Sequence, residues 1–122
     1  MDIHTETMTN ACVLQITGEL DAASVNNFEQ QCPSNFWQKA NPVVVDLSGV
    51  TFIDSSGVGM LVFLVKRLWA QQCQVSLAGL QGQPARLVTM LRIQQSIPCY
   101  DSVQACLNSL DGQSNVANVG RL

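Results

Sequence analysis

The sequence predicts one α/β domain with a small mixed β-sheet of four to five strands and about four helices, in the order ββαβαβαβα. Along the 122 residues, short apolar segments alternate with segments of helical periodicity, which is typical of a mostly parallel sheet with helical crossovers. Only Thr9-Asn10 separates the first two strand-like segments, which predicts a hairpin and an antiparallel edge. A doubly wound, flavodoxin-like domain is the alternative, but no Gly-rich loop follows the first strand.

The N-terminal third predicts two strands and a helix. Residues Ile3–Met8 can form a short edge strand, and Ala11–Thr17 alternates more regularly before Gly18 breaks the pattern. Asp21 is a suitable N-cap for a helix over residues 22–37. The apolar residues at helical spacing in that helix are Val25, Phe28, Cys32 and Phe36.

The rest of the chain repeats strand and helix three times. Val43–Leu47 is a near-continuous apolar strand, expected in the middle of the sheet. A loop over residues 48–57 should lead into a helix over 56–72. The remaining predicted elements are a strand over 75–78, a helix over 84–93, an edge strand over 97–100 and a helix from Asp101 or Ser102 to Leu110. We expect the domain to span residues 1–110 and residues 111–122, rich in Gly, Ser and Asn, to form a flexible tail.

The composition argues against several function classes. The net charge is −3 and the six Lys and Arg are scattered, whereas nucleic-acid binding requires a basic stripe. The N-terminus lacks a signal-peptide pattern, and the longest apolar run, residues 58–65, is far shorter than the ~20 residues of a membrane span. We therefore expect a cytoplasmic protein with no direct membrane insertion. Charged residues make up only 12%, against about 25% on average, which indicates a surface partly covered by another protein.

The sequence also gives no sign of a metal, a cofactor or a catalytic centre. The five cysteines have no paired spacing, and His4 is the only histidine. Ile53 and Asp54 stand where a serine-hydrolase motif would need glycine. We therefore expect reduced, mostly buried thiols and no enzymatic activity.

The segment that carries chemical information is Asp54-Ser55-Ser56-Gly57, at the start of the predicted apolar helix. Helix N-termini have unpaired N–H groups and a partial positive charge, so Asp or Ser there is an ordinary cap. The same position also favours a phosphate, and phosphorylation of a serine there would change the surface without melting the helix. Both interpretations remain open from the residues alone.

The helix that follows has apolar residues on more than one side. The stripe expected to pack on the sheet contains Val58, Leu61, Val62, Val65, Leu68 and Trp69. Met60, Phe63 and Leu64 then fall on the far side. Either Met60 and Phe63 are exposed and form a protein interface, or another helix of the same domain covers them.

At this point the sequence resembles the STAS domain family of anti-sigma factor antagonists and their relatives. The resemblance lies in Val43-Val-Val-Asp-Leu-Ser-Gly-Val-Thr-Phe-Ile-Asp-Ser-Ser-Gly-Val-Gly59, in Thr17-Gly-Glu-Leu-Asp21 and in Ile97-Pro-Cys-Tyr-Asp-Ser102. It implies a small mixed sheet with helices on one main face. It also implies that Ser55 is phosphorylated by a partner that is both an anti-sigma factor and a serine kinase, with Asp21 and Asp54 beside it.

The resemblance leaves two kinds of partner. In the antagonist branch, the unphosphorylated protein would bind the anti-sigma factor, and phosphorylation would release it. The residues expected to contact the partner are Asp21, Asp54, Ser56, Gly57, Met60 and Phe63. The alternative is a constitutive STAS subunit that binds the ATPase of a lipid-trafficking ABC transporter, with no phosphate turnover.

Overall fold

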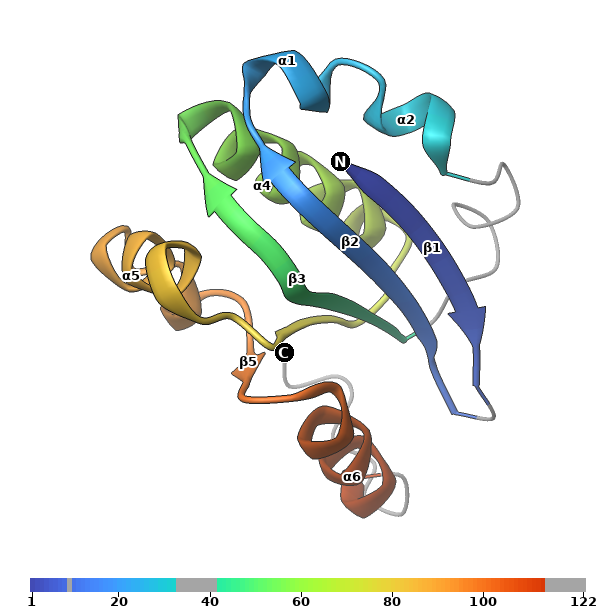
Figure 1. The fold of residues 1–122 in the computed structure, drawn as a ribbon. Coiled ribbons are helices and arrows are strands. Elements are labelled where there is room, and N and C mark those ends of the chain that lie inside the picture. Colours follow the sequence, from blue (N-terminus) through green and yellow to red (C-terminus); the bar gives the residue numbers. More distant parts are fainter. Residues whose placement is uncertain (9, 33–41, 114–122) are drawn as a thin grey trace.

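The computed structural model describes residues 1–8, 10–32 and 42–113, which form a five-stranded mixed sheet (Figure 1). The strands lie in the sheet in the same order as in the chain, and β1 is antiparallel to β2 while all other neighbours are parallel. The predicted fold class is therefore confirmed. The strands are β1 (Asp2–Thr7), β2 (Cys12–Leu20), β3 (Val43–Ile53), β4 (Val75–Ala78) and β5 (Cys99–Tyr100).

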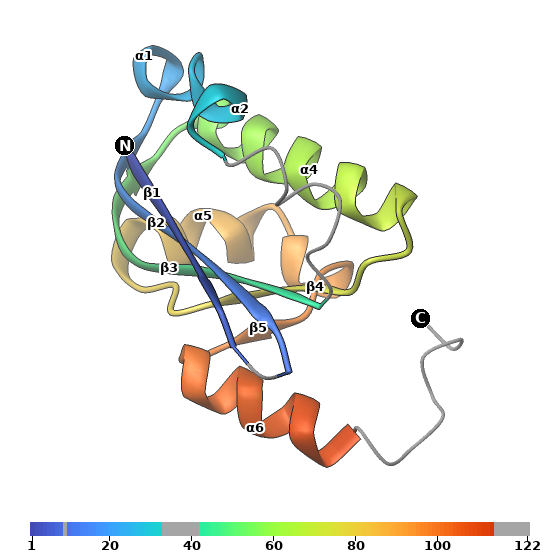
Figure 2. The same ribbon diagram turned by 90° about the vertical axis from the view of Figure 1, so that its right-hand side faces the viewer.

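Helices cover the two faces of the sheet unequally. The crossover helices lie on one face and α6 lies on the other (Figure 2), because parallel crossovers of one hand return to the same side of the sheet. The helices are α1 (Ala22–Val25), α2 (Phe28–Gln31), α4 (Ser55–Ala70), α5 (Gly82–Met90) and α6 (Val103–Gln113), with a short 3₁₀ helix at Ile93–Gln95. Among the described residues, no helix is long and apolar enough to span a membrane.

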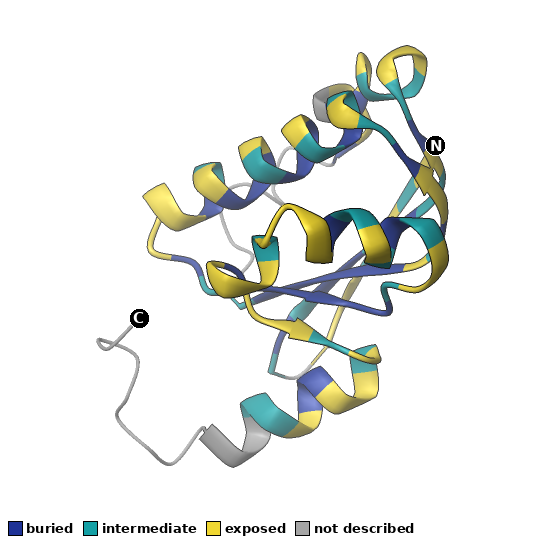
Figure 3. Ribbon diagram, turned by 90° about the vertical axis from the view of Figure 1, so that its left-hand side faces the viewer, coloured by how far each residue is buried: buried dark blue, intermediate teal, exposed yellow. Residues whose placement is uncertain are grey.

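The sheet separates two apolar clusters. The larger lies under α4, where Leu14, Val45 and Leu64 are fully buried. The smaller lies under α6 and joins Val44 of β3 to Cys106 of α6. Burial on both faces explains why Val43–Leu47 has no polar alternation, and Figure 3 shows the buried residues of the strands and the inner sides of the helices.

The predicted ends of the two central strands are wrong. β2 does not stop at Gly18 but continues to Leu20, and the loop expected from Ser48 is strand as far as Ile53. The extension follows from pairing between the strands, where Gly18 lies opposite Val50 and Leu20 opposite Ile53. Two register shifts accommodate the extra residues of β3, as β-bulges do.

The single helix predicted over residues 22–37 is also wrong in its described part. The chain forms two one-turn helices, interrupted at Asn26 and Asn27, residue types with low helix propensity. The apolar residues of this segment nevertheless include two that face the core, since Phe28 and Cys32 are buried in the larger cluster. Phe36 lies outside the described residues.

The C-terminal elements differ from the prediction in length. α5 ends at Met90, and Arg92 has a left-handed backbone (φ 58°) before the 3₁₀ helix begins. β5 has two residues instead of four. α6 runs to Gln113, three residues past the expected end at Leu110, and residues 114–122 lie outside the described part of the chain.

Candidate functional site

The candidate site forms where β2 and β3 end side by side. The last pair of the ladder is Leu20 with Ile53, and the N–H of Asp54 donates to the carbonyl of Leu20 at 3.1 Å. The next residue of each strand caps a helix, Asp21 for α1 and Asp54 for α4. The structure therefore brings these two predicted site residues, 33 positions apart, to the same edge of the sheet.

Both aspartates are occupied as helix caps. Asp54 Oδ1 accepts from the Gly57 N–H at 3.0 Å. Asp21 Oδ1 accepts from the Ser24 N–H at 2.9 Å, and Ser24 Oγ in turn accepts from the Asp21 N–H. These hydrogen bonds, above all the one from the Ser24 backbone, lower the pKa of Asp21. The structural interpretation of Asp54 as an N-cap is therefore confirmed.

Ser55 is the first residue of α4, and its side chain is exposed. Within the described residues, the structure records no hydrogen bond to the Ser55 hydroxyl. The neighbouring Ser56 is half-buried. A free hydroxyl at an exposed helix N-terminus is accessible to another protein, and a negative charge there is compatible with the helix dipole.

Gly57 is buried and allows α4 to lie directly against the end of β2. A Cβ atom at this position would overlap the carbonyl oxygen of Leu20 and lie 2.7 Å from its Cβ. Gly57 therefore shapes the site by permitting close packing, while the outer surface is formed by its neighbours.

The outer face of α4 resolves the two alternatives for Met60 and Phe63. Met60 is buried at 7% exposure, and Leu64 is fully buried, so the expectation that both lie on the far side of the helix is wrong. Phe63 is 46% exposed, and Trp69, which was expected to pack on the sheet, is 42% exposed. The buried side is thus rotated from the predicted stripe.

One exposed stripe connects the serine to the exposed aromatic residue. Ser55, Gly59 and Phe63 are four residues apart and are all exposed, which places them on one side of the helix. Lys66 and Ala70 continue the same exposed stripe. We call the surface formed by Ser55, Gly59, Phe63, Lys66 and Ala70 the α4 stripe.

Gln83 of α5 is a second support for this site that sequence reasoning missed. Its side-chain amide makes two hydrogen bonds to the backbone of Ile53, the residue before Asp54. The two residues are 30 positions apart, and a glutamine at the start of a helix has no local signal for such a contact.

Comparison with known proteins agrees with this architecture. The sequence model of the STAS domain family matches residues 2–106. A Planctomyces limnophilus protein described as an anti-sigma-factor antagonist (STAS) domain protein has a TM-score of 0.71 and 26% identity, over 89% of this chain and 97% of that chain. An anti-sigma factor antagonist from Mycobacterium paratuberculosis gives 0.78 and 19%, over 89% and 92%. The anti-sigma factor antagonist SpoIIAA in its unphosphorylated form gives 0.63 and 21%, over 93% and 99%.

Proposed function

The chain belongs to the STAS domain family, and on this basis we propose that it is a non-enzymatic protein-interaction switch of the anti-sigma factor antagonist type. Its partner is an anti-sigma factor with serine kinase activity, and its phosphorylation site is Ser55. The observation that carries the proposal is the exposed Ser55 hydroxyl at the start of α4, on the same stripe as the exposed Phe63. A switch in bacterial transcription signalling of this kind acts in the cytoplasm.

The local geometry supports a switch that spares the fold. A phosphate on Ser55 adds about −1.5 to −2 charges at the N-terminus of a 16-residue helix. The helix dipole favours that charge, so the fold should tolerate it. The carboxylates of Asp21 and Asp54 cap helices at the same sheet edge, so the phosphate makes an already acidic surface more negative.

The added charge acts on the partner. Like charges brought together at a desolvated interface cost several kcal/mol, and a cost of about 2.8 kcal/mol weakens binding roughly a hundredfold. The unphosphorylated protein would therefore hold the anti-sigma factor, with Asp21, Asp54 and Ser56 near the contact. The phosphorylated protein would release it.

A second candidate function is a constitutive subunit that binds the ATPase of a lipid-trafficking ABC transporter. The exposed aromatic side chains Phe63 and Trp69 on one helix favour it, because a permanent contact buries apolar surface and needs no phosphate. This candidate predicts that co-purification does not depend on the state of Ser55.

The experiment combines intact-mass analysis with co-purification from the native cells. We expect a phosphorylated fraction that disappears in Ser55→Ala, a kinase that co-purifies with Ser55→Ala, and loss of that kinase in Ser55→Asp. Ser102→Asp is a matched control, since exposed Ser102 caps α6 on the opposite face and aspartate preserves the cap. Equal binding of Ser55→Ala and Ser55→Asp would contradict the switch, and an ATPase retained by both would support the transporter subunit.

A further inference from the structure

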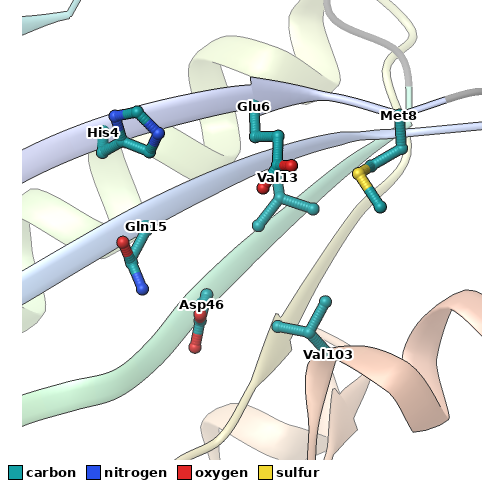
Figure 4. Close-up of a pocket in the computed structure, with 7 residues that line it drawn as sticks. All are labelled: His4, Glu6, Met8, Val13, Gln15, Asp46 and Val103. Carbon is teal, nitrogen blue, oxygen red and sulfur yellow. The ribbon is translucent and has the colours of Figure 1, made fainter.

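The face of the sheet opposite α4 has a cavity of about 140 Å³ beside α6 (Figure 4). Strands β1, β2 and β3 supply its side chains together with the first residue of α6. The lining residues are His4, Glu6, Met8, Val13, Gln15, Asp46 and Val103. α6 packs over the part of this face formed by Val44 and Ala78, which leaves the outward side chains of β1 uncovered.

Asp46 is the unusual group in this cavity. It lies in the central strand β3 and is only 8% exposed. Its Oδ1 atom accepts from both the N–H and the hydroxyl of Ser48, at 3.0 and 2.7 Å. Within the described residues, its second carboxylate oxygen receives no hydrogen bond. Because every buried side-chain N or O atom among the described residues has a hydrogen-bond partner, this oxygen reaches solvent, and Asp46 lines the cavity.

The neighbouring side chains make the cavity suitable for a positive charge on an apolar stem. The register places His4 opposite Gln15 and Gln15 opposite Asp46, so three polar side chains form a row across three strands. Glu6 adds a second carboxylate from β1, beside Val13 of β2. The apolar part of the lining is formed by Met8, Val13 and Val103.

The described basic residues do not neutralise these carboxylates. None of the described residues that line the cavity is a lysine or arginine. Lys66 and Arg67 belong to α4 and Arg86 belongs to α5, helices that cover the other face of the sheet (Figure 2), and Arg92 directly precedes the 3₁₀ helix that follows α5. Among the described residues, no lysine or arginine therefore meets Asp46 within the cavity.

We propose that this cavity binds an organic cation, a primary ammonium or guanidinium group carried on an aliphatic stem. Asp46 and Glu6 receive the charged group, the Gln15 amide adds a hydrogen bond, and the valines contact the methylenes. The volume is well below the ~300 Å³ of a drug-sized site, so it suits a small amine or one side chain and excludes a nucleotide. The site is on the opposite face from Ser55, so it can be occupied whichever partner binds the α4 stripe.

The test is a titration of the ¹⁵N-labelled full chain, followed by NMR at constant ionic strength. The probes are cadaverine, for a free amine, and N-acetyl-lysine methylamide and N-acetyl-arginine methylamide, for side chains of another protein. Pentanol and sodium chloride are the uncharged and inorganic controls. We expect saturable shifts centred on His4, Gln15 and Asp46 with the cations and none with the controls. Tighter binding of cadaverine identifies a free amine as the ligand, and tighter binding of a capped amino acid identifies a protein side chain.

Two variants test the assignment of the carboxylates. Asp46→Asn removes the charge and keeps an oxygen for the two Ser48 hydrogen bonds, and Glu6→Gln changes an exposed residue of β1. Each is expected to weaken binding of the cations at least tenfold. Glu19→Gln, at an exposed position of β2 that does not line the cavity, should leave binding unchanged. Absence of saturable shifts with every cation, or equal weakening by Glu19→Gln, would overturn the proposal.

Discussion

The side-chain amide of Gln83 binds both backbone polar groups of Ile53. Gln83 Oε1 accepts from the Ile53 N–H at 2.9 Å, and Gln83 Nε2 donates to the Ile53 carbonyl at 2.8 Å. The pairing of β3 with β4 covers only Val43 to Asp46, so the end of β3 has no neighbouring strand on that side. Gln83 replaces the missing strand for one residue and fixes the backbone next to Asp54.

We therefore expect Gln83→Ala to lower the free energy of unfolding by about 1–3 kcal/mol, because it removes two hydrogen bonds from a part-buried backbone segment. Hydrogen exchange of the Ile53 amide should become faster. Gln81→Ala is the control, since exposed Gln81 makes one longer bond, 3.3 Å, to the Ser48 carbonyl, and its effect should be below about 0.5 kcal/mol. Similar losses in the two variants, measured by urea unfolding, would contradict this role of Gln83.

The two glycines of α4 should respond in opposite directions to alanine. Gly57→Ala forces a methyl group against Leu20 and should destabilise the protein by roughly 1–3 kcal/mol. Gly59 is exposed, with open space where a Cβ would be, so Gly59→Ala should stabilise the helix by up to about 1 kcal/mol. Thermal unfolding of both variants measures this difference, and a stabilising Gly57→Ala would disprove the close packing.

Alanine substitutions at Met60 and Phe63 should have different effects, one on the stability of the fold and the other on partner binding. Met60→Ala removes a side chain buried under α4 and should cost about 2–5 kcal/mol of unfolding free energy. Phe63→Ala should change stability little, because its ring is 46% exposed. It should instead weaken partner binding about tenfold, since exposed aromatic residues dominate many interfaces. Calorimetry with the co-purified partner tests this, and unchanged affinity in Phe63→Ala would remove Phe63 from the interface.

The protein should lose stability in alkaline solution. Burial raises the pKa of the Cys73 thiol from 9.0 to about 11, whereas the thiol of the unfolded chain titrates near 8.5. Between these values the folded state holds more protons than the unfolded state, so stability falls as pH rises from about 8.5 to 11. The contribution of this thiol is at most about 1.4 kcal/mol per pH unit.

Cys73→Ser provides the comparison, because serine can keep the bond that the thiol donates to the Gln74 carbonyl. Urea unfolding between pH 8 and 10.5 should give a shallower loss of stability for the variant than for the original protein. Parallel curves would show that Cys73 does not contribute to the alkaline loss. The slope should decrease without vanishing, because burial also raises the pKa of Cys12 and Cys106.

The order of strands and helices along the chain and the two capping aspartates could be predicted from the sequence, because both depend on local patterns. Alternating and continuous apolar segments indicated β2, β3 and β4. Asp21 and Asp54 directly precede the helices that they cap, so their capping role depends only on neighbouring residues. The strand ends were missed because the ladder from Gly18 to Leu20 depends on a partner strand more than 30 residues away. No local pattern records such a pairing.

The buried side of α4 was missed for a different reason. Every residue from Met60 to Val65 is apolar, so periodicity does not define one inward direction. The direction is set by packing, which includes the close approach of Gly57 to Leu20. Gln83 and the Asp46 cavity were equally inaccessible to sequence reasoning, because each joins elements that are distant in the chain.

The two borders of the sheet differ in their capacity for self-association through main-chain pairing. Strand β5 offers only two residues, too few to seed growth of a sheet from a second molecule. On β1, the exposed side chains of Asp2, His4 and Glu6 follow one another along the border, and charged borders discourage edge-to-edge aggregation. We therefore expect this domain to remain resistant to fibril-like stacking even at high concentration in the cell.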